Sequence, residues 1–507
     1  MTAPTPLPLD LESPAQAMHA ALEAQRADFL RHVPVSYAVR HDRLERGLAM
    51  LAAHRKKLVE AGLQDFGERG PEWTLLQEVF GTVAAYQSAL KNLKRWMRPE
   101  RRSAPVPFNL FGATAQIQYQ PLGVVGIMGA WNGPITLVLG PLAPVLAAGN
   151  RAMLCPSDLM PASAAAVAEA VREYFDVTEV TAVSGGLEVN KAFSALPFDH
   201  LMFTGSPGVG AKIMAAAAPN LVPVTLELGG KCPVVIGEDA DMDDAAQRLA
   251  VTKTLNGGQA CLSPDHFFVP RKRLDDFLQR IDAAMATLHP DPAANPNYCG
   301  MAIDRYYQRI LDIIEDARQR GARVQTLGLR DGQALTNASA RRIAVHAVID
   351  APADSRVMRE ELFGPLLAIS TYDDVEDACL RIRLQPKPLG LYVFSRSARF
   401  RQFVLDRTFS GGVTLNDALY HYGVSSMPFG GVGRSGMGAY SYGIDGFRRF
   451  SHARGIYKQG GPRALLRVMR PPYGWMFDMA IRQPIEKIAR KKLAAPRHPA
   501  DPGGGTS

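Results

Sequence analysis

Residues 223–265 read PVTLELGGKCPVVIGEDADMDDAAQRLAVTKTLNGGQACLSPD, and the rest of the chain is organised around this stretch. Two short β-branched runs, at residues 224–227 and 234–236, predict strands, and a helical pattern follows them. Glu227 ends the first run, whereas Cys261 lies in a small, polar loop after the predicted helix. A thiol nucleophile and a carboxylate base are the two groups that a thiol-acylation cycle requires.

Before this stretch, short apolar runs alternate with helical patterns, which is typical of βαβ units around a parallel sheet. The predicted strands are residues 116–119, 124–128, 152–155, 179–183, 200–203, 224–227 and 234–236. The predicted helices between them are residues 135–148, 162–174 and 208–217. This alternation predicts a doubly wound α/β domain.

The flanking regions have different patterns. Three helices are predicted for the opening of the chain, at residues 13–31, 35–61 and 71–97. The first of them has a serine cap and a proline in its first turn. A second α/β unit is expected from Gly229 to about Ser410. From Gln459 the chain is basic, and residues 496–507 have the composition of a disordered segment.

Size and composition are those of a globular enzyme with more than one domain. A chain of 507 residues exceeds a single core, and 47% of its residues are hydrophobic. The net charge of +8 is modest, so no nucleic-acid partner is predicted. A solvated basic face is favoured over peripheral contact of the basic tail with acidic lipid.

Cysteine usage indicates a reducing compartment. The five cysteines are too scattered for a disulfide scaffold, and no two of them have metal-ligand spacing, so no metal site is predicted. They are Cys155, Cys232, Cys261, Cys299 and Cys379. The N-terminus has neither a basic start nor an apolar run, so it does not resemble a secretory signal. These features predict a cytoplasmic protein.

Residues 103–150 contain no charged side chain and no histidine, which raises the question of a membrane span. Prolines and glycines interrupt this stretch, and no clean apolar run reaches the roughly 20 residues that a spanning helix needs. The stretch is therefore predicted to form buried strands and a buried helix.

A series of motifs in chain order resembles the aldehyde dehydrogenase family. ELGGK at residues 227–231 and GGQAC at residues 257–261 are similar to the two signatures of that family and have its spacing. Further matches are AWNGP at 130–134, FTGSPGVG at 203–210, EELFGP at 360–365, SGGVTLN at 410–416 and PFGGVGRSG at 428–436. Three further segments resemble the class 3 and coniferyl-aldehyde branch of the family: SALPFD at 194–199, KPLGLYV at 387–393 and PPYG at 471–474.

The resemblance implies an aldehyde dehydrogenase-like α/β fold with a doubly wound, Rossmann-type cofactor domain. Its implied parts are the cofactor domain at residues 1–107 and 122–228, an α/β catalytic domain at 229–412, a bridging oligomerisation element at 108–121 and 413–458, and a basic, partly disordered tail at 459–507. The resemblance to class 3 also implies a homodimer, which is the assembly typical of that class.

The implied reaction is the NAD(P)-dependent oxidation of an aldehyde to a carboxylate through a cysteine thiohemiacetal and thioester. The resemblance makes Cys261 the nucleophile, Glu227 the base for the hydrolytic water, and Asn132 an oxyanion donor together with the Cys261 backbone N–H. The plainer alternatives are a structural cysteine, a solvated edge carboxylate and a turn asparagine. Small residues before Cys261 favour a reactive thiol, and partial burial could raise the pKa of Glu227.

The glycine-containing loop after the predicted strand 200–203 is suited to a pyrophosphate. Ser206 can cap the following helix and Pro207 suits its first turn, so the helix N-terminus offers amides to the anion. The alternative is an ordinary βα turn. The resemblance places a nicotinamide dinucleotide on this loop, whose residues are Gly205, Ser206, Pro207, Gly208, Val209 and Gly210.

Four more cofactor contacts are implied, at Trp131, Leu228, Glu361 and Phe363. In the family the last two hold the nicotinamide ribose and pack beside the nicotinamide. Without the resemblance, Glu361 and Phe363 would be interpreted as a surface acid and a core aromatic.

The chain departs from the family at two places. Where Lys-Pro-Ser-Glu usually grips the adenosine ribose, residues 155–158 place Cys155 and Asp158 at the lysine and glutamate positions. A 2′-phosphate would lose an attractive charge and meet a repulsive one, so NAD is expected over NADP. The second departure is YSYG at residues 440–443, where the class 3 branch tends to have Tyr-His-Gly.

The coniferyl-like resemblance suggests an aromatic enal, with medium-chain or long-chain aldehydes as alternatives. Two other functions stay open at this point. One is a thiol esterase or a family member whose cofactor binding is impaired by Cys155. The other is a non-catalytic structural or membrane-surface protein.

Overall fold

The computed structural model describes residues 13–67, 69–106, 108–438, 442–461 and 470–490. The chain forms two compact units, Met1–Met97 with Gln120–His452, and Arg98–Tyr119 with Ala453–Ser507. The domain borders expected from the resemblance stay a prediction. The end of the tail predicted to be disordered, residues 496–507, lies outside the described residues.

The opening of the first unit is helical, as predicted. Its elements are α1 (Pro14–Arg31), α2 (Tyr37–Phe66), α3 (Pro71–Thr74), the π-helix η1 (Leu75–Phe80) and α4 (Gly81–Trp96). The Ser13 hydroxyl accepts the Gln16 N–H, which confirms the predicted cap. The second helix runs five residues further than expected, to Phe66, and stops at Gly67, whose φ of 71° no other residue type adopts easily.

A six-stranded sheet follows, in the order β17-β7-β6-β3-β4-β5. Its strands are β3 (Val124–Met128), β4 (Arg151–Cys155), β5 (Val180–Ala182), β6 (His200–Thr204), β7 (Val224–Glu227) and β17 (Gly436–Met437). Only β17 is antiparallel to its neighbour. The connecting helices are α5 (Thr136–Ala148), α6 (Pro161–Tyr174), α7 (Leu187–Ser194) and α8 (Pro207–Ala217). The doubly wound prediction is confirmed.

The strand order reverses between β3 and β6, because β4 and β5 lie on one side of β3 whereas β6 and β7 lie on the other. In such sheets ligands bind beyond the carboxyl ends of the strands at this switch point. The segment after β3 carries Trp131 and Asn132, and the segment after β6 carries the loop at residues 205–210. The topology therefore brings these two predicted site segments together.

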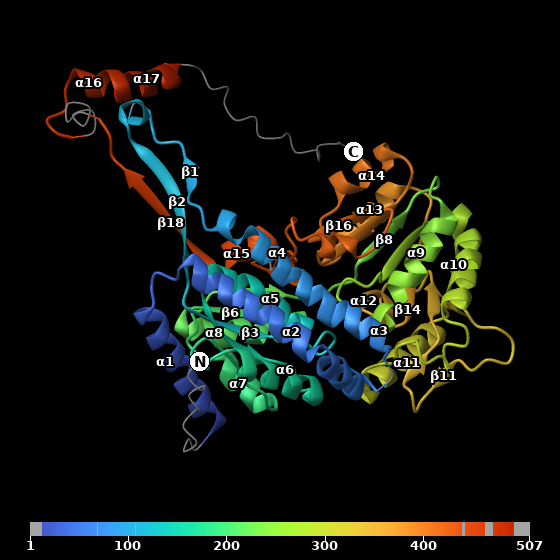
Figure 1. Cartoon of the computed structure of the whole chain (residues 1–507). Helices are drawn as coiled ribbons and strands as arrows, with labels where there is room; N and C mark the ends of the chain where they lie inside the picture. Colours follow the sequence, from blue (N-terminus) through green and yellow to red (C-terminus); the bar gives the residue numbers. More distant parts are fainter. Residues whose placement is uncertain (1–12, 68, 107, 439–441, 462–469, 491–507) are drawn as a thin grey trace. The chain divides into compact units, whose positions relative to one another are not determined.

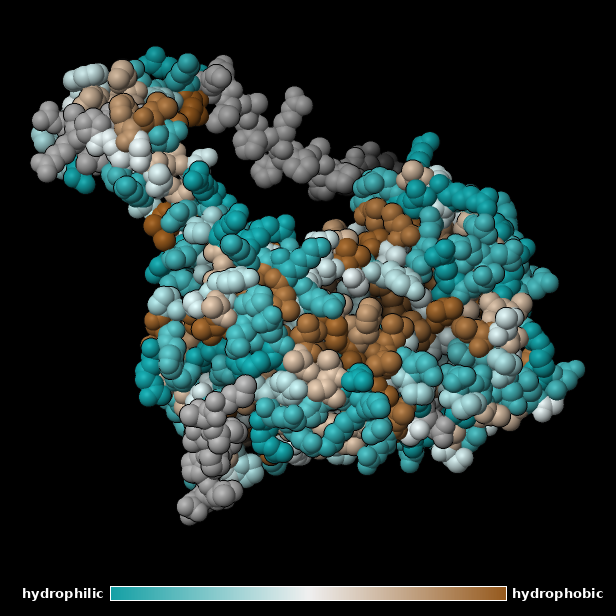
Figure 2. Space-filling view, in the orientation of Figure 1, coloured by the Kyte–Doolittle hydropathy of each residue, from teal (hydrophilic) through white to brown (hydrophobic). Residues whose placement is uncertain are grey.

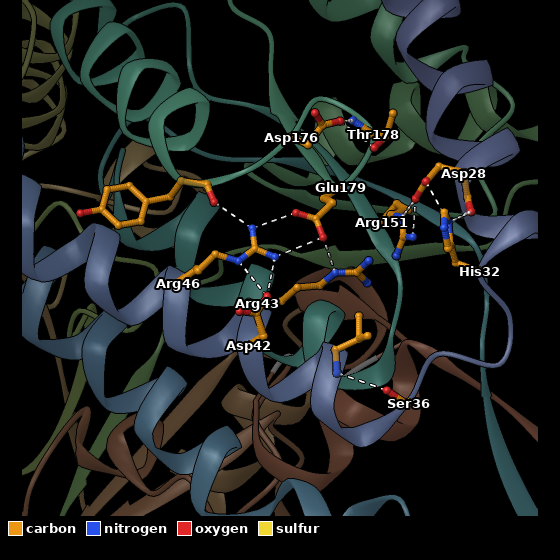
Figure 3. A network of polar contacts seen from close by, with 12 residues as sticks. Asp28, His32, Ser36, Asp42, Arg43, Arg46, Arg151, Asp176, Thr178 and Glu179 are labelled. Atoms are coloured by element: carbon orange, nitrogen blue, oxygen red, sulfur yellow. Dashed lines mark hydrogen bonds and ion pairs between the residues drawn. The ribbon is translucent and has the colours of Figure 1, made fainter. Parts of the chain in front are cut away.

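The N-terminal helices dock on this sheet through both packing and charge. Helix α2 packs against α6, and α4 packs against α5 (Figure 1). Glu179, next to β5, accepts from Arg43 Nε at 2.9 Å and from Arg46 NH1 at 2.8 Å (Figure 3). Asp28 of α1 pairs with the buried Arg151 of β4.

A second sheet has seven strands in the order β10-β13-β14-β9-β8-β15-β16, and all but β10 run parallel to their neighbours. Its strands are β8 (Pro233–Ile236), β9 (His266–Pro270), β10 (Arg323–Thr326), β13 (His346–Ile349), β14 (Leu366–Tyr372), β15 (Gly390–Phe394) and β16 (Gly412–Leu415). The accompanying helices are α9 (Met242–Thr254), α10 (Leu274–Leu288), α11 (Asp304–Gln319), α12 (Arg356–Arg359), α13 (Val375–Arg383) and α14 (Ala398–Arg407). Helix α15 (Gly443–Arg449) packs instead against α4 and α5. A small hairpin is formed by β11 (Thr336–Asn337) and β12 (Arg342–Ile343). The expected second α/β unit is thus present.

The later part of the charge-free stretch, residues 124–148, forms buried structure as predicted, whereas the strand at residues 114–121 is only half-buried and belongs to a different sheet. Strand β3 is fully buried and nearly all of α5 is buried, although α5 contains two prolines. Among the described residues, no helix is both long enough and apolar enough to cross a bilayer.

The second unit contains a three-stranded sheet in the order β1-β2-β18, formed by β1 (Glu100–Arg102), β2 (Thr114–Pro121) and β18 (Ser451–Lys458). Near its end lie α16 (Trp475–Phe477), the π-helix η9 (Asp478–Arg482) and α17 (Gln483–Arg490). Figure 2 shows apolar side chains exposed on these helices. They include Trp475, Met479, Ile485 and Ile488, each of which is more than half exposed.

Candidate active site

Cys261 is presented by a loop whose backbone only small residues allow. After α9, the 3-10 segment η4 (Leu255–Gly258) has three successive residues with positive φ, which are Asn256, Gly257 and Gly258. A methyl group on Gly258 would overlap the carbonyl oxygen of Gly364. Glycine is therefore required for both the left-handed conformation and the close backbone approach.

Cys261 is the half-buried cysteine, whereas the other four are buried. Burial, together with the charges of Glu361 and Glu227, raises the pKa of its thiol to about 12, although the Cys261 and Leu262 backbone N–H groups act in the opposite direction. Cys232 donates its thiol to the Cys261 carbonyl at 3.3 Å, which fixes the backbone of Cys261. The sulfur thus has two amides directed at it and two carboxylates nearby.

Asn132 connects the two sheets at this point. Its Nδ2 donates to the Gln259 carbonyl at 3.1 Å, two residues before Cys261. Asn256 Nδ2 donates to the Asn132 carbonyl at 3.1 Å, and also to the Gln259 carbonyl. A primary amide carries two N–H groups, so the bond to Gln259 leaves the Asn132 side chain a second donor.

Glu227 is placed at the carboxyl end of β7 by bonds on both sides of its backbone. Its carbonyl accepts the Gly205 N–H at 3.0 Å, and it pairs with Gly436 of β17. Its side chain is 6% exposed and interacts electrostatically with Cys261 and Tyr442. The carboxylate and the thiol, 34 residues apart in sequence, therefore lie in the same site.

The loop at residues 205–210 has the form of an anion cradle. The Ser206 hydroxyl accepts the Val209 N–H, and Pro207 is in the first turn of α8, as predicted. A methyl group on Gly208 would meet nothing within 4 Å, whereas one on Gly210 would lie 2.9 Å from Leu228 Cδ2. Gly208 thus leaves space over the helix N-terminus, Gly210 allows close packing, and the cradle fits a dinucleotide pyrophosphate.

Three aromatic rings of the site, those of Trp131, Tyr306 and Phe363, pack together. Trp131 stacks on Tyr306 with 4.6 Å between ring centroids and meets the edge of Phe363 at 5.4 Å. Phe363 has a φ of 48°, a strained conformation for an aromatic residue and one that clusters at functional sites. The cluster thus offers apolar ring faces and edges of the kind that pack against a planar heterocycle.

Glu361 lies close enough to Cys261 for its charge to act on the thiol. Its Oε1 accepts the Gly230 N–H at 3.0 Å. Burial, with the negative charge of Asp265, raises the pKa of Glu361 to about 8. The hydrogen bond from Gly230 and the positive charges of Lys231 and Arg309 act in the opposite direction. The carboxyl is therefore directed at the backbone of the ELGGK motif. Its side chain would have to rotate to reach a ribose.

Cys155 and Asp158 stand at the end of β4, where the adenosine ribose is expected. Cys155 is buried, and its thiol donates to Asn190 Oδ1 at 3.2 Å. Burial raises the pKa of Cys155 to about 12, with a contribution from Asp158, so this sulfur is a neutral donor. Asp158 is exposed.

Several residues that shape the site were not identified from the sequence. Lys231 donates to Asp265 and to the carbonyls of Val357 and Glu360, the last two at 2.8 and 2.9 Å. Arg309 holds the same segment, because it donates to the carbonyls of Leu362 and Glu361. Lys231 belongs to the quoted ELGGK motif, but Arg309 carries no local signal.

The family model described as "Aldehyde dehydrogenase family" matches residues 10–456. The chain belongs to the aldehyde dehydrogenase family. A coniferyl aldehyde dehydrogenase from a Pseudomonas species is 43% identical over 460 residues, which cover 91% of this chain and 94% of the relative. Rat aldehyde dehydrogenase family 3 member A2 is 40% identical over 366 residues, covering 71% and 73%. These relatives confirm the class 3 and coniferyl-aldehyde branch.

Solved structures of aldehyde dehydrogenases have the same fold. A substrate-bound Staphylococcus aureus AldH has a TM-score of 0.83 and 30% identity, over 93% of this chain and 99% of that chain. A Mycobacterium tuberculosis aldehyde dehydrogenase complexed with NAD+ has a TM-score of 0.77 and 27% identity, over 88% and 91%. This aldehyde dehydrogenase is accordingly an oxidoreductase that oxidises an aldehyde with NAD(P)+.

Proposed function

We propose that the reaction proceeds through a thioester on Cys261, with Asn132 as oxyanion donor and Glu227 as the base for hydrolysis. The Asn132–Gln259 hydrogen bond is the observation that carries this proposal, because it places the amide from one sheet against the thiol loop of the other. Glu227 and Glu361 supply the carboxylates beside the sulfur.

In the first half-reaction the Cys261 thiolate, formed by loss of the thiol proton to solvent, bonds to the aldehyde carbon, and the carbonyl π electrons move to oxygen. The resulting oxyanion accepts hydrogen bonds from Asn132 Nδ2 and the Cys261 N–H, a kind of donor that typically contributes about 10²–10³ in rate. Bound NAD+ supplies the hydride acceptor. Loss of the hydride from carbon restores the C=O bond and leaves an acyl group on sulfur.

In the second half-reaction Glu227 takes a proton from water as the water oxygen bonds to the thioester carbon. The same two donors hold the new oxyanion, and collapse breaks the C–S bond to release the carboxylic acid and the thiolate. The sum is aldehyde, NAD+ and water to carboxylate, NADH and two protons. Glu227 is suited to this task because it is buried beside the sulfur and not in bulk water.

The deciding experiment follows NADH absorbance with an aromatic aldehyde for the wild-type protein and Cys261→Ala. Cys379→Ala is the control, since Cys379 is buried in a separate cluster with α13 and α14. We expect Cys261→Ala to abolish NADH formation and the control to retain it. Ester hydrolysis without NADH formation would support the esterase alternative, and full activity of Cys261→Ala would refute the proposal.

We infer that the cofactor is NAD in preference to NADP. The support is the neutral Cys155 thiol and the exposed Asp158 at the expected ribose position, which together offer a 2′-phosphate no cation. The test compares kcat/KM for NAD and NADP in the wild type and in Cys155→Lys. We expect the lysine to shift the ratio toward NADP, and a wild-type preference for NADP would overturn the inference.

We infer that the substrate is an aromatic aldehyde of the coniferyl type. The Pseudomonas relative named as a coniferyl aldehyde dehydrogenase supports this inference. So do the rings of Tyr422, Phe429 and Tyr442, which pack with Cys261 around one apolar cluster. A kcat/KM panel with cinnamyl-type, benzyl-type and medium-chain aldehydes tests it, and a clear preference for the aliphatic chain would contradict it.

We further propose a cytoplasmic homodimer. The expected reducing compartment agrees with the five free cysteines. The exposed apolar side chains of α16, η9 and α17 support a second copy as their partner. Sedimentation analysis of the wild type and of Ile485→Asp with Ile488→Asp tests the dimer. Binding of the wild type to acidic vesicles, lost in this variant, would instead favour the membrane alternative.

A further inference from the structure

A buried ion pair between Arg69 and Glu78 adjoins the segment that carries Asn132. Arg69 and Glu78 have no exposed side-chain area, and Arg69 NH1 lies 2.9 Å from Glu78 Oε1. Both come from the helical opening of the chain, since Arg69 precedes α3 and Glu78 belongs to η1. Burying two charges has a desolvation cost that a stable fold can avoid with apolar residues, so this pair calls for an explanation.

The second oxygen of Glu78 caps helix α5. Glu78 Oε2 accepts the N–H groups of Ile135 and Thr136, each at 3.0 Å. These amides begin α5, and Ile135, at the N-cap position, makes no side-chain cap hydrogen bond. A carboxylate at a helix N-terminus satisfies the unpaired amides and interacts favourably with the helix dipole. Asn132 lies three residues before the first capped amide.

The segment around Asn132 is also held from other directions. Thr136 forms a side-chain hydrogen bond with Tyr422, at the start of the same helix. The Arg69 guanidinium lies 4.4 Å over the Phe66 ring, whose centroid is 6.4 Å from that of Trp131. Residues 129–136 are thus fixed at the helix end by Glu78 and at the thiol end by the bond from Asn132 to Gln259.

We propose that Glu78, with its charge balanced by Arg69, is a positioning residue that sets the side-chain amide of Asn132 for the oxyanion. This inference rests on the role proposed above for Asn132. In this role Glu78 contacts neither the Cys261 sulfur nor the carbonyl group of the substrate. It acts through the backbone of α5. Oxyanion donors are sensitive to placement, and a displacement of about 1 Å can reduce the rate roughly 10²-fold.

The test compares Glu78→Ala, Asn132→Ala and the double variant. We expect Glu78→Ala to lower kcat by about 10–100-fold and to change KM for the aldehyde little. In the Asn132→Ala background, Glu78→Ala should lower kcat by less than about threefold, because both changes remove the same donor. Full additivity of the two losses would overturn the proposal.

Glu179→Gln is the matched control. Glu179 also forms ion pairs with arginines, Arg43 and Arg46, but lies beside β5 and caps no helix of the site. We expect this variant to lose thermal stability and to retain kcat. An equal loss of kcat in Glu179→Gln and in the Glu78 variants would show that only general stability had changed, and would refute the positioning role.

Alkylation of Cys261 by iodoacetamide separates positioning from damage to the thiol loop, because this reaction needs no oxyanion donor. The alkylation rate of Glu78→Ala should match the wild type. If Glu78→Ala does not fold, Glu78→Gln decides. Glutamine has one oxygen in place of two, so its NH2 group must face either Arg69 or the amides of α5, and both sides cannot be satisfied. A several-fold lower kcat supports the proposal, and wild-type kcat refutes it.

The same assays show which of the two proposals fails. Full activity of Asn132→Ala would refute the proposed oxyanion role itself. A large loss in Asn132→Ala, together with wild-type kcat in both Glu78 variants, would refute only the inference about Glu78.

Discussion

Asn132 donates its side-chain amide to the carbonyl oxygen of Gln259 at 3.1 Å, although 127 residues separate them in sequence. This bond joins the segment after β3 to the thiol loop. It uses one N–H of the amide, and in the proposed mechanism the other donates to the substrate oxygen.

Replacing Asn132 with alanine should lower kcat by about 10²–10³-fold and leave KM for the aldehyde nearly unchanged, because the lost hydrogen bond strengthens in the transition state. Steady-state NADH formation over a range of aldehyde concentrations measures both constants. An increase in KM with constant kcat would mean that Asn132 only binds the substrate.

Glu227→Gln should separate the two half-reactions. In the proposed mechanism thioester formation does not need this carboxylate, whereas hydrolysis does, so one equivalent of NADH per site is expected in a rapid burst before a slow steady state. Stopped-flow absorbance on wild type and variant measures the burst. A variant with neither burst nor turnover would place Glu227 in the first half-reaction instead.

The reactivity of Cys261 in the free protein should increase with pH up to strongly alkaline conditions. Burial raises the pKa of its thiol to about 12, so the reactive thiolate fraction rises about tenfold per pH unit below that value. Alkylation by iodoacetamide, measured from about pH 7 to about pH 10 and located by mass spectrometry, tests this. A plateau near neutral pH would contradict the raised pKa.

Glu179 should stabilise the fold at neutral pH and lose that effect in acid. Burial alone would raise its pKa, but the hydrogen bonds and charges of Arg46 and Arg43 outweigh burial and lower it. A lowered pKa adds stability above the unfolded value near about 4.3, and this stability disappears as pH falls through the folded value.

Glu179→Gln should therefore reduce the free energy of unfolding by about 2 kcal/mol at neutral pH and by much less in acid. Urea unfolding at several pH values measures the difference. Glu188→Gln is the control, since its pair with Lys191 is exposed and should contribute under about 1 kcal/mol. A pH-independent difference for Glu179→Gln would show that titration is not involved.

Gly258→Ala should abolish activity, whereas Gly321→Ala should cause only mild destabilisation. The two glycines have the same φ of 76°, so the backbone strain is matched. A methyl group on Gly321 meets nothing within 4 Å, but one on Gly258 overlaps the Gly364 carbonyl. Activity and thermal unfolding of both variants test this, and equal behaviour would mean that strain alone decides.

Local patterns were sufficient to predict much of the fold. The strands at residues 124–128 and 224–227 were predicted with their observed bounds, because buried parallel strands are continuous apolar runs bounded by glycine and polar residues. The caps at Ser13 and Ser206 were predicted for a similar reason, since a cap is a contact over three residues.

Contacts between distant segments were not predictable from a single sequence. The pairing of β17 with β7 joins residues more than 200 positions apart, and the bonds of Glu78 to the start of α5 follow no local pattern. The motifs resembling the family supplied the candidate residues. They gave no distances, no direction for the Glu361 carboxyl, and no indication that Lys231 and Arg309 hold its segment.

The glycine at residue 258 leaves no side chain between the segment that bears the nucleophile and the segment that follows Phe363. The two main chains therefore bear directly on one another and have little freedom to shift separately. A displacement of the Trp131, Tyr306 and Phe363 rings, such as that caused by an oversized ring bound beside Trp131, would therefore also shift the Cys261 sulfur. Compounds that bind only beside these rings would in this way displace Cys261 without contacting it.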